Sequence, residues 1–240
     1  MKILQWKVVI VLAALFALGC EKPPKGDEAK ITDKEQASQA TGQTFVVDTA
    51  ESYVQFTGYG VGKNHPGTFK LNYGATAVKN DSISGGSFVI NIKSMDMTQE
   101  GDDIENKLRP HLLSGDFFDA DKFGTATFEI TKVLPYELEE DAEKSLVEGA
   151  NYAISGNLKI KDVSKNITFP ARVELEGNTL KADANFDIDR REWQMSYGND
   201  KTLGDKFISE TVNIKFHIEA MNDKAATDFS ANAEESEEME

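Results

Sequence analysis

From Phe45 onward the chain alternates between apolar and polar residues with a period of two. Successive side chains of a β-strand point to opposite faces, so this alternation predicts strands with one apolar and one polar face. The alternating segments are residues 53–57, 69–77, 88–92, 125–130, 152–160, 167–175, 180–188 and 208–218. A sandwich and a closed barrel both satisfy this pattern, but the strand count, the hairpin order and the lack of a second helical layer favour a barrel. We therefore predict an all-β fold, a single antiparallel barrel of about eight strands.

Glycine and proline residues punctuate these segments. The pair Gly85-Gly86 suits a bulge or sharp bend, and Pro170 predicts an edge or bulge within its strand. Gly177-Asn178 is a typical two-residue hairpin turn. Residues 135–151 are rich in Glu and Asp and are predicted to form an acidic surface loop.

The strand pattern is interrupted once, by a short amphipathic segment. Ile104, Leu108 and Leu112 recur every four residues on one face of a predicted helix, which the aspartates at 102 and 103 can cap. Two adjacent aromatic residues, Phe117 and Phe118, follow the helix between acidic neighbours. An apolar helix face in a β protein needs a hydrophobic surface to cover. We therefore expect this insert to cover the open end or flank of the barrel.

The predicted inward faces carry both large and small residues. The large ones are Phe56, Phe69, Phe88, Phe128, Phe169, Phe186 and Phe216, and the small ones are Ala75, Ala77, Ala126, Ala171, Ala182 and Ala184. In one interpretation the two sizes interdigitate and fill the barrel. In the other they leave an elongated apolar cavity for a lipid chain, whose burial contributes about 0.8 kcal/mol per methylene.

Two polar stretches are candidates for the mouth of such a cavity. The glycine-rich segment 60–67 can form a barrel rim, and segment 189–193 closes the penultimate strand with charges beside Trp193. In the functional interpretation Arg190 or His65 meets a ligand head group; in the alternative these are turn residues and a surface ion pair. The predicted ligand-binding residues are the seven inward phenylalanines named above and seven more. The additional seven are Ile90, His111, Phe117, Phe118, Ile154, Arg190 and Trp193.

Charge and motifs exclude several functions. The formal net charge is −15, which disfavours a nucleic-acid partner. Much of the excess lies in residues 221–240, which are predicted to be a disordered acidic tail. The three histidines, His65, His111 and His217, show no metal-ligand spacing, and there is no nucleophile elbow, Walker loop or dinucleotide fingerprint. We predict no enzyme, no metal site and no cofactor other than a bound lipid or isoprenoid.

The N-terminus has the features of an export signal. Lys2 and Lys7 precede an apolar run over 8–18 that is too short to span a bilayer, which is typical of a signal peptide over residues 1–19. Gly19 and the only cysteine, Cys20, are similar to a lipoprotein lipobox, although ordinary cleavage before Cys20 stays open. The polar residues 20–43 then predict a flexible tether between a membrane and the domain. These features place the protein in a bacterial cell envelope, anchored by a lipid and facing the periplasm or the exterior.

Four segments together resemble the YceI-like family. Residues 111–120, followed by 123–128, resemble the family signature H-L-x-S-x-D-F-F-D-x…P-x-x-x-F. Val47-Asp48 is similar to the family's opening V-D, residues 156–165 to its G-x-L-x-I-x-G-V-T-x segment, and residues 188–193 to its I-N-R-x-D-F. The resemblance covers residues 44–220, which we predict to be the globular domain. The chain departs from these motifs at Gly124, Asp162 and Asp189, and its acidic loop is an addition.

The resemblance implies an extended lipocalin-like barrel with a helical insert, which binds a polyisoprenoid or another amphipathic lipid inside. A carrier or storage protein for a long apolar ligand, such as an isoprenoid, quinone-like or fatty-acid-type lipid, is therefore our leading interpretation. A filled barrel acting as a tethered structural or stress-related interaction protein is the alternative, and an enzyme that modifies a lipid or quinone is a third. The sequence leaves the oligomeric state open, a homodimer included.

Overall fold

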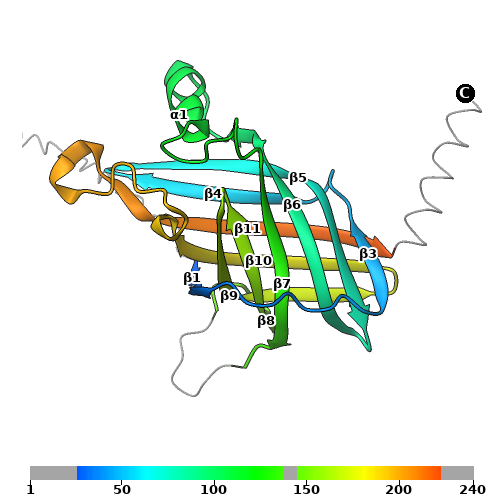
Figure 1. Ribbon diagram of the computed structural model, residues 1–240. Helices are drawn as coiled ribbons and strands as arrows, with labels where there is room; N and C mark the ends of the chain where they lie inside the picture. The colour runs from blue at the N-terminus through cyan, green and yellow to red at the C-terminus, as the bar shows by residue number, and fades with distance from the viewer. Residues whose placement is uncertain (1–25, 138–144, 223–240) are drawn as a thin grey trace, which may run out of the picture.

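A computed structural model describes residues 26–137 and 145–222 of the chain (Figure 1). The predicted signal peptide, Cys20, the centre of the acidic loop and the tail beyond Asn222 lie outside the described residues. Within these two ranges, no helix is long and apolar enough to cross a membrane.

The wall is a closed antiparallel barrel, as predicted, with eight strand positions. Its strands are β3 (Gln43–Val47), β4 (Tyr53–Gly60), β5 (Lys63–Lys79), β6 (Ser82–Met97), β7 (Thr125–Pro135), β8 (Tyr152–Ile160), β9 (Val163–Glu176), β10 (Thr179–Asp189) and β11 (Ile208–Asn222). Strands β3 and β4 share one position, because they pair with opposite ends of β5 and β11. Pairing of β10 with both β9 and β11 closes the ring.

The two ends of the barrel differ (Figure 1). At the helical end lie the β4–β5 turn and four helical segments: η1 (Ile104–Leu108), α1 (Arg109–Leu113), η2 (Arg190–Trp193) and η3 (Lys201–Lys206). At the opposite end, the hairpin end, strands β5 and β6 join at Asn80-Asp81 and strands β9 and β10 at Gly177-Asn178. The latter is the predicted two-residue turn, with Gly177 at a φ of 59°. The helical segments of the described residues therefore gather at one end of the barrel.

Most predicted strands are found, but β5 changes face partway along. Phe69 and Leu71 point inward, as expected, whereas Tyr73 is 52% exposed and Thr76 is buried facing the interior. The pairing of β5 with β6 shifts register between Leu71 and Tyr73 and again after Ala77. At the shift between Leu71 and Tyr73 the extra residue lies in β5, so the β5 residues that follow point to the other face. The prediction that Tyr73, Ala75 and Ala77 continue the inward face was therefore wrong.

The segment 60–67 and the helical insert also differ from prediction. Only residues 61–62 form a turn in the glycine-rich segment, and the rest belongs to β4 and β5. Residues 104–113 are helical as predicted, but the Asp103 side chain forms no capping hydrogen bond. The Lys107 ammonium lies 2.6 Å from the Asp103 carboxylate, one helical turn away, so the capping role is replaced by an i,i+4 ion pair.

The N-terminal segment 26–42 is part of the wall, which corrects our prediction of a flexible tether through residue 43. Strand β1 (Asp27–Glu28) pairs in parallel with residues 186–187 of β10, and β2 (Lys30–Asp33) pairs antiparallel with residues 165–168 of β9. Direct pairing between β9 and β10 reaches only Ala171. Because the next residue toward the helical end, Pro170, has no N–H to donate, β9 and β10 separate there. Strands β1 and β2 fill the resulting seam.

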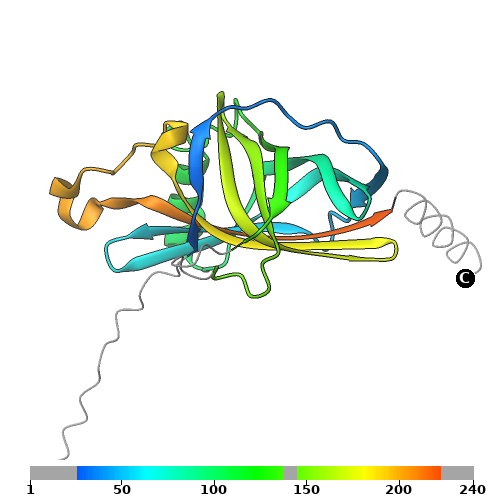
Figure 2. The same cartoon turned by 90° about the horizontal axis from the view of Figure 1, so that it is seen from below.

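The same segment then crosses the outside of the barrel (Figure 2). The Asn157 side chain on β8 accepts a hydrogen bond from the Glu35 amide at 3.0 Å and donates one to the Glu35 carbonyl at 2.8 Å. The Ser38 amide donates to Ile130 O on β7 at 3.0 Å. A Cβ on Gly85 would lie 2.8 Å from Ser38 Oγ and 3.1 Å from Ala40 Cα, so the predicted bulge also makes room for this crossing. Residues 26–42 thus form a strap, which is the name used below.

His217 lies on the outer face of β11 between two carboxylates and makes stability depend on pH. Its ring nitrogens lie 2.7 Å from Asp183 Oδ1 and 3.2 Å from Glu219 Oε1. Burial acts to lower the pKa of His217, but the two carboxylates outweigh burial and raise this pKa above its ordinary value of 6.5. The stabilisation is therefore complete below pH 6.5 and is lost as the pH rises through the folded-state pKa, by up to about 1 kcal/mol.

Urea unfolding at several pH values between about 6 and 8 will measure this loss. The His217→Gln variant is the control, because it has no ring to titrate. A parallel pH dependence in both proteins would contradict the assignment to His217.

Candidate functional site: an apolar cavity inside the barrel

The barrel interior is not filled. It contains a cavity of about 680 Å³ that opens at the helical end. This volume is roughly four to five times the ~150 Å³ apolar cavity that holds a benzene molecule, so it has room for on the order of 25 carbon atoms. Leu180 and Ile188 on β10 both line it, and eight residues of strand extend over about 26 Å. The cavity is therefore long, and it runs along the strands.

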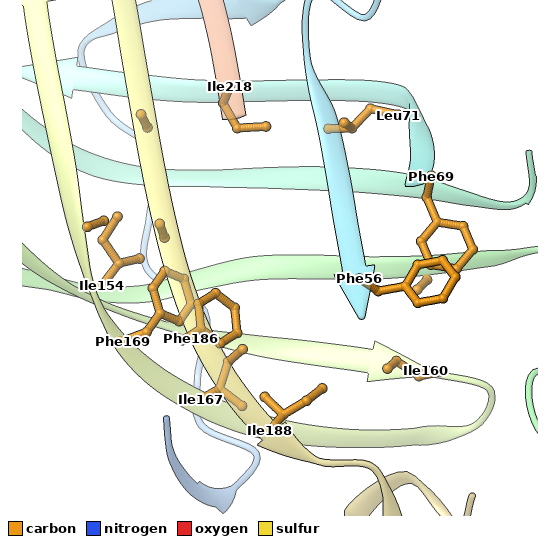
Figure 3. Packing of buried hydrophobic residues seen from close by; sticks show 14 of the residues in the cluster. Phe56, Phe69, Leu71, Ile154, Ile160, Ile167, Phe169, Phe186, Ile188 and Ile218 are labelled. Atoms are coloured by element: carbon orange, nitrogen blue, oxygen red, sulfur yellow. The ribbon is translucent and has the colours of Figure 1, made fainter. Parts of the chain in front are cut away.

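Aromatic rings form two groups along the cavity (Figure 3). The rings of Phe169 and Phe186 stack with centroids 4.2 Å apart. Phe216 meets Phe169 edge-on at 5.6 Å. Separately, Phe56 of β4 stacks on Phe69 of β5 at 4.9 Å. The alternation places these residues inward, and the register of neighbouring strands brings them into contact. The walls therefore offer broad, nearly rigid apolar surfaces.

Most of the predicted ligand-binding residues line this cavity. Those that do are Phe56, Phe69, Phe88, Ile90, His111, Phe117, Phe118, Phe128, Ile154, Phe169, Phe186, Arg190 and Phe216. Trp193 does not: it is fully buried in η2, and its Nε1 donates to Leu158 O at 3.0 Å. Its indole therefore fixes the β10–β11 connection to β8. Among the predicted small residues, only Ala126 and Ala182 reach the cavity.

The helical insert covers part of the opening, as expected from its apolar face. Leu108 and Leu112 line the cavity together with His111 and the two phenylalanines that follow. The ring of His111 contacts Phe117 and Tyr197 edge-on, at centroid distances of 5.2 Å and 4.7 Å. Its Nε2 lies 2.8 Å from Asp116 Oδ2. The insert is thereby joined to the β10–β11 connection across the opening.

Arg190 is buried at the opening and is occupied by the protein itself. Its exposed fraction is 3%, and its guanidinium donates hydrogen bonds to four backbone carbonyls. The acceptors are the carbonyls of Met195, Tyr197, Ile208 and Ser209. Burial lowers the pKa of Arg190. The guanidinium also lies 5.8 Å from the centroid of the Phe117 ring. Arg190 thus holds the β10–β11 connection in place, a role that the sequence interpretation missed.

The remaining polar groups of the cavity are few. His65 lines the opening, where its Nδ1 lies 3.1 Å from Gln99 Oε1. Thr76 lines the interior, and its hydroxyl donates to Gly85 O at 2.9 Å. Burial, and secondarily the Asp187 carboxylate, raises the pKa of Tyr59 to about 12. The phenol therefore stays neutral at physiological pH. Sequence alternation did not indicate Thr76, because it places this residue on the outer face of a strand without the β5 bulge.

The described residues carry no cluster of three His, Cys, Asp or Glu side chains able to hold a metal ion. The cavity can enclose an apolar molecule. Each methylene group that leaves water for the cavity contributes about 0.8 kcal/mol to the binding free energy. Polar groups are concentrated at the opening. This geometry suits a molecule with a long apolar body.

The fold and cavity define a closed antiparallel barrel with an apolar interior, of the lipocalin-like class. The sequence profile of the YceI-like domain matches residues 45–220. The chain therefore belongs to the YceI-like family. No curated protein sequence matches the chain.

Two solved structures share this fold. BcnA from Burkholderia cenocepacia is 22% identical, with a TM-score of 0.56 over 72% of this chain and 98% of that one. A polyisoprenoid binding domain from Saccharophagus degradans, implicated in plant cell wall breakdown, is 16% identical. Its TM-score is 0.55, over 75% of this chain and 99% of that one. These similarities establish the barrel architecture.

Proposed function

We propose that the protein binds one long apolar lipid inside the barrel and acts as a carrier or storage protein. The observation that carries this proposal is the cavity of about 680 Å³, which is lined mainly by aliphatic and aromatic side chains. Ligand pockets are typically about 300–1,000 Å³ and mostly apolar, with few polar groups. A binding role, without catalysis, accounts for the cavity.

A polyisoprenoid is the ligand class we favour. The polyisoprenoid binding domain of Saccharophagus degradans has the same barrel, and a branched chain suits a cavity with broad aromatic walls. A quinone-like or fatty-acid-type lipid would fit the same volume. Polar groups of the ligand would lie at the helical end, where His65 and His111 line the opening.

We further propose that the protein is a lipoprotein of the bacterial cell envelope. The apolar run before Cys20 and the Gly19-Cys20 pair support export and lipidation at this cysteine. The mature chain would then be held at a membrane and face the periplasm or the cell exterior. Mass spectrometry of the purified mature chain, after digestion, tests whether its first residue is a lipid-modified Cys20.

Native mass spectrometry of the full-length mature protein tests the binding function. We expect a noncovalent lipid adduct that organic extraction removes. Replacing Ala126 or Ala182 by Phe should reduce the adduct at least about tenfold, because the added ring occupies the cavity and overpacks its walls. Ala171→Phe is not a suitable control, since Ala171 is fully buried and overpacking there would disturb the wall itself.

Tyr73→Phe provides the matched control, because Tyr73 is exposed on the outer wall. This variant should retain the adduct. An empty wild-type barrel that also fails to take up polyprenols, quinones or fatty acids from vesicles would refute the carrier function. Full adduct in a folded Ala126→Phe variant would place the lipid elsewhere.

A further inference from the structure

Exposed apolar residues lie beside the cavity opening at the helical end. Val61, at the tip of the β4–β5 hairpin, lines the opening and is 52% exposed. Tyr197 and Leu203, in the β10–β11 connection, are 48% and 44% exposed. Tyr197 lies against His111, which itself lines the opening. These three residues form the rim discussed below.

The two parts of the rim are adjacent. Ile208 pairs with Gly60, so the chain that follows Leu203 runs back beside the hairpin that carries Val61. A Cβ on Gly60 would lie 3.8 Å from the Phe207 carbonyl oxygen. Large apolar side chains that protrude beside the opening of an apolar cavity are typical of a surface that meets another apolar phase.

Charge is distributed unevenly at the helical end. The helical insert and its flanks, residues 98–124, contain seven acidic and three basic residues. In contrast, the β10–β11 connection over residues 189–207 contains four acidic and four basic residues. An anionic lipid surface would therefore repel the insert, but it would not repel the β10–β11 connection that carries Tyr197 and Leu203.

The attachment point of the strap limits the orientation further. Gly26 is fixed to the wall, because its amide donates to Asp187 Oδ1 at 3.1 Å and the next residue pairs with Phe186. Cys20 and Gly26 are six positions apart, and a fully extended chain of that length spans about 20 Å. The hairpin turn at Asn178 is eight residues of β10 away from Phe186, or about 26 Å. The connection to a lipid on Cys20 is therefore shorter than the distance along β10 to the hairpin turn, which disfavours an upright barrel with its hairpin end on the membrane.

We propose that the apolar rim of Val61, Tyr197 and Leu203 docks on the lipid bilayer that holds the anchor, so that the cavity opens directly onto the membrane. This inference rests on the lipidation and lipid binding of the proposed function, and it adds the surface and the orientation. A lipid would then pass between bilayer and barrel without crossing water.

Site-directed spin labelling of the full-length lipidated protein, in vesicles of phosphatidylethanolamine and phosphatidylglycerol, tests this orientation. Because Cys20 is the only cysteine and its thiol would carry the lipid, each introduced cysteine takes a single label. We expect labels in Val61→Cys and Leu203→Cys to collide more with oxygen than with a water-soluble nickel chelate. Labels in Asn178→Cys and Lys215→Cys, on the hairpin end and outer wall, should show the reverse.

A charge variant tests whether the apolar rim causes the docking. Leu203→Asp should shift the label at position 61 toward the nickel chelate severalfold. Tyr73→Asp, which removes an equally exposed aromatic residue from the outer wall, should leave that label unchanged. The lipid adduct seen by native mass spectrometry should persist in both variants, because neither residue lines the cavity.

Three results would overturn the proposal. Rim labels exposed to water, or an immersed label at position 215, would show another orientation while leaving lipid binding intact. Strong spin–spin broadening at position 61 would show that a second copy of the chain covers the rim. A free thiol at Cys20 would instead refute the lipidation, and with it the short connection on which this orientation depends.

Discussion

Replacing Arg190 by alanine is expected to lower the free energy of unfolding by about 4 kcal/mol, because buried carbonyls lose their charged donor. Its guanidinium donates to the carbonyls of Met195, Tyr197, Ile208 and Ser209. The neighbouring Arg191 is half-exposed and pairs only with Asp189 at the surface among the described contacts. Arg191→Ala should therefore cost less than about 1 kcal/mol. Urea unfolding of the two variants compares a buried and an exposed arginine at adjacent positions.

The lysine variant separates the two roles proposed for Arg190. Arg190→Lys keeps the positive charge but loses the planar arrangement of donors that reaches several carbonyls at once. If Arg190 is structural, the lysine variant should be destabilised nearly as much as the alanine variant. Should Arg190→Ala instead keep wild-type stability and lose its lipid adduct, the head-group role that the sequence suggested would be correct.

Deleting the strap is the second change with a large expected effect. A chain that begins at residue 35 lacks β1 and β2, and the seam between β9 and β10 is left without its filling strands. Lost burial of Ala29 and Ile31 and the lost ladder hydrogen bonds should together cost about 3 kcal/mol. Phe169 and Phe186 lie beside this seam and line the cavity, so the bound lipid should also be released.

A chain that begins at residue 26 is the matched control, since it keeps every strap contact described above. Hydrogen exchange will locate the effect: amides of residues 165–168 and 186–188 should lose protection only in the shorter chain. Exposed strand edges should also make that chain prone to self-association. Equal unfolding free energies and equal protection in the two chains would show that the strap adds nothing to the wall.

The barrel itself was predictable because every wall strand buries one face. Such a strand must alternate, and the alternation over 152–160 coincides with the bounds of β8. The turn at Gly177 was equally visible, because a two-residue hairpin requires the backbone freedom of glycine. Local rules of this kind depend only on residues close together in the sequence.

The strap could not be predicted, because nothing in its own composition requires a strand. Residues 26–42 are polar, as a tether would be, and only Ala29 and Ile31 pack against the core. The strap becomes ordered by pairing with the free edges of β9 and β10, and these edges exist only once the barrel has formed. The face change in β5 has a similar origin, because a bulge is set by pairing with β6.

For the site, the sequence identified the cavity walls better than the polar groups. Inward phenylalanines such as Phe169 and Phe186 follow from alternation, and they line the cavity. The functions of Arg190 and Trp193 depend on the β10–β11 connection, which has no periodic pattern. A charged residue beside an aromatic residue at a strand end is compatible with a head-group contact and with a structural role. Only the hydrogen-bond partners of Arg190 in the structure distinguish the two.

The strap also fixes the order in which the protein can fold. Asp27 of β1 pairs with Phe186 of β10, which lies 159 residues later in the chain. One of the first strands to be synthesised therefore cannot pair until β10 has been made. Contacts so distant in sequence form slowly, because a long loop must close first. A nascent chain therefore cannot complete its wall before nearly all of it has been made. For the exported protein proposed above, this delay would keep the polypeptide unfolded during passage through a translocation channel and would place the final step of folding on the far side of the membrane.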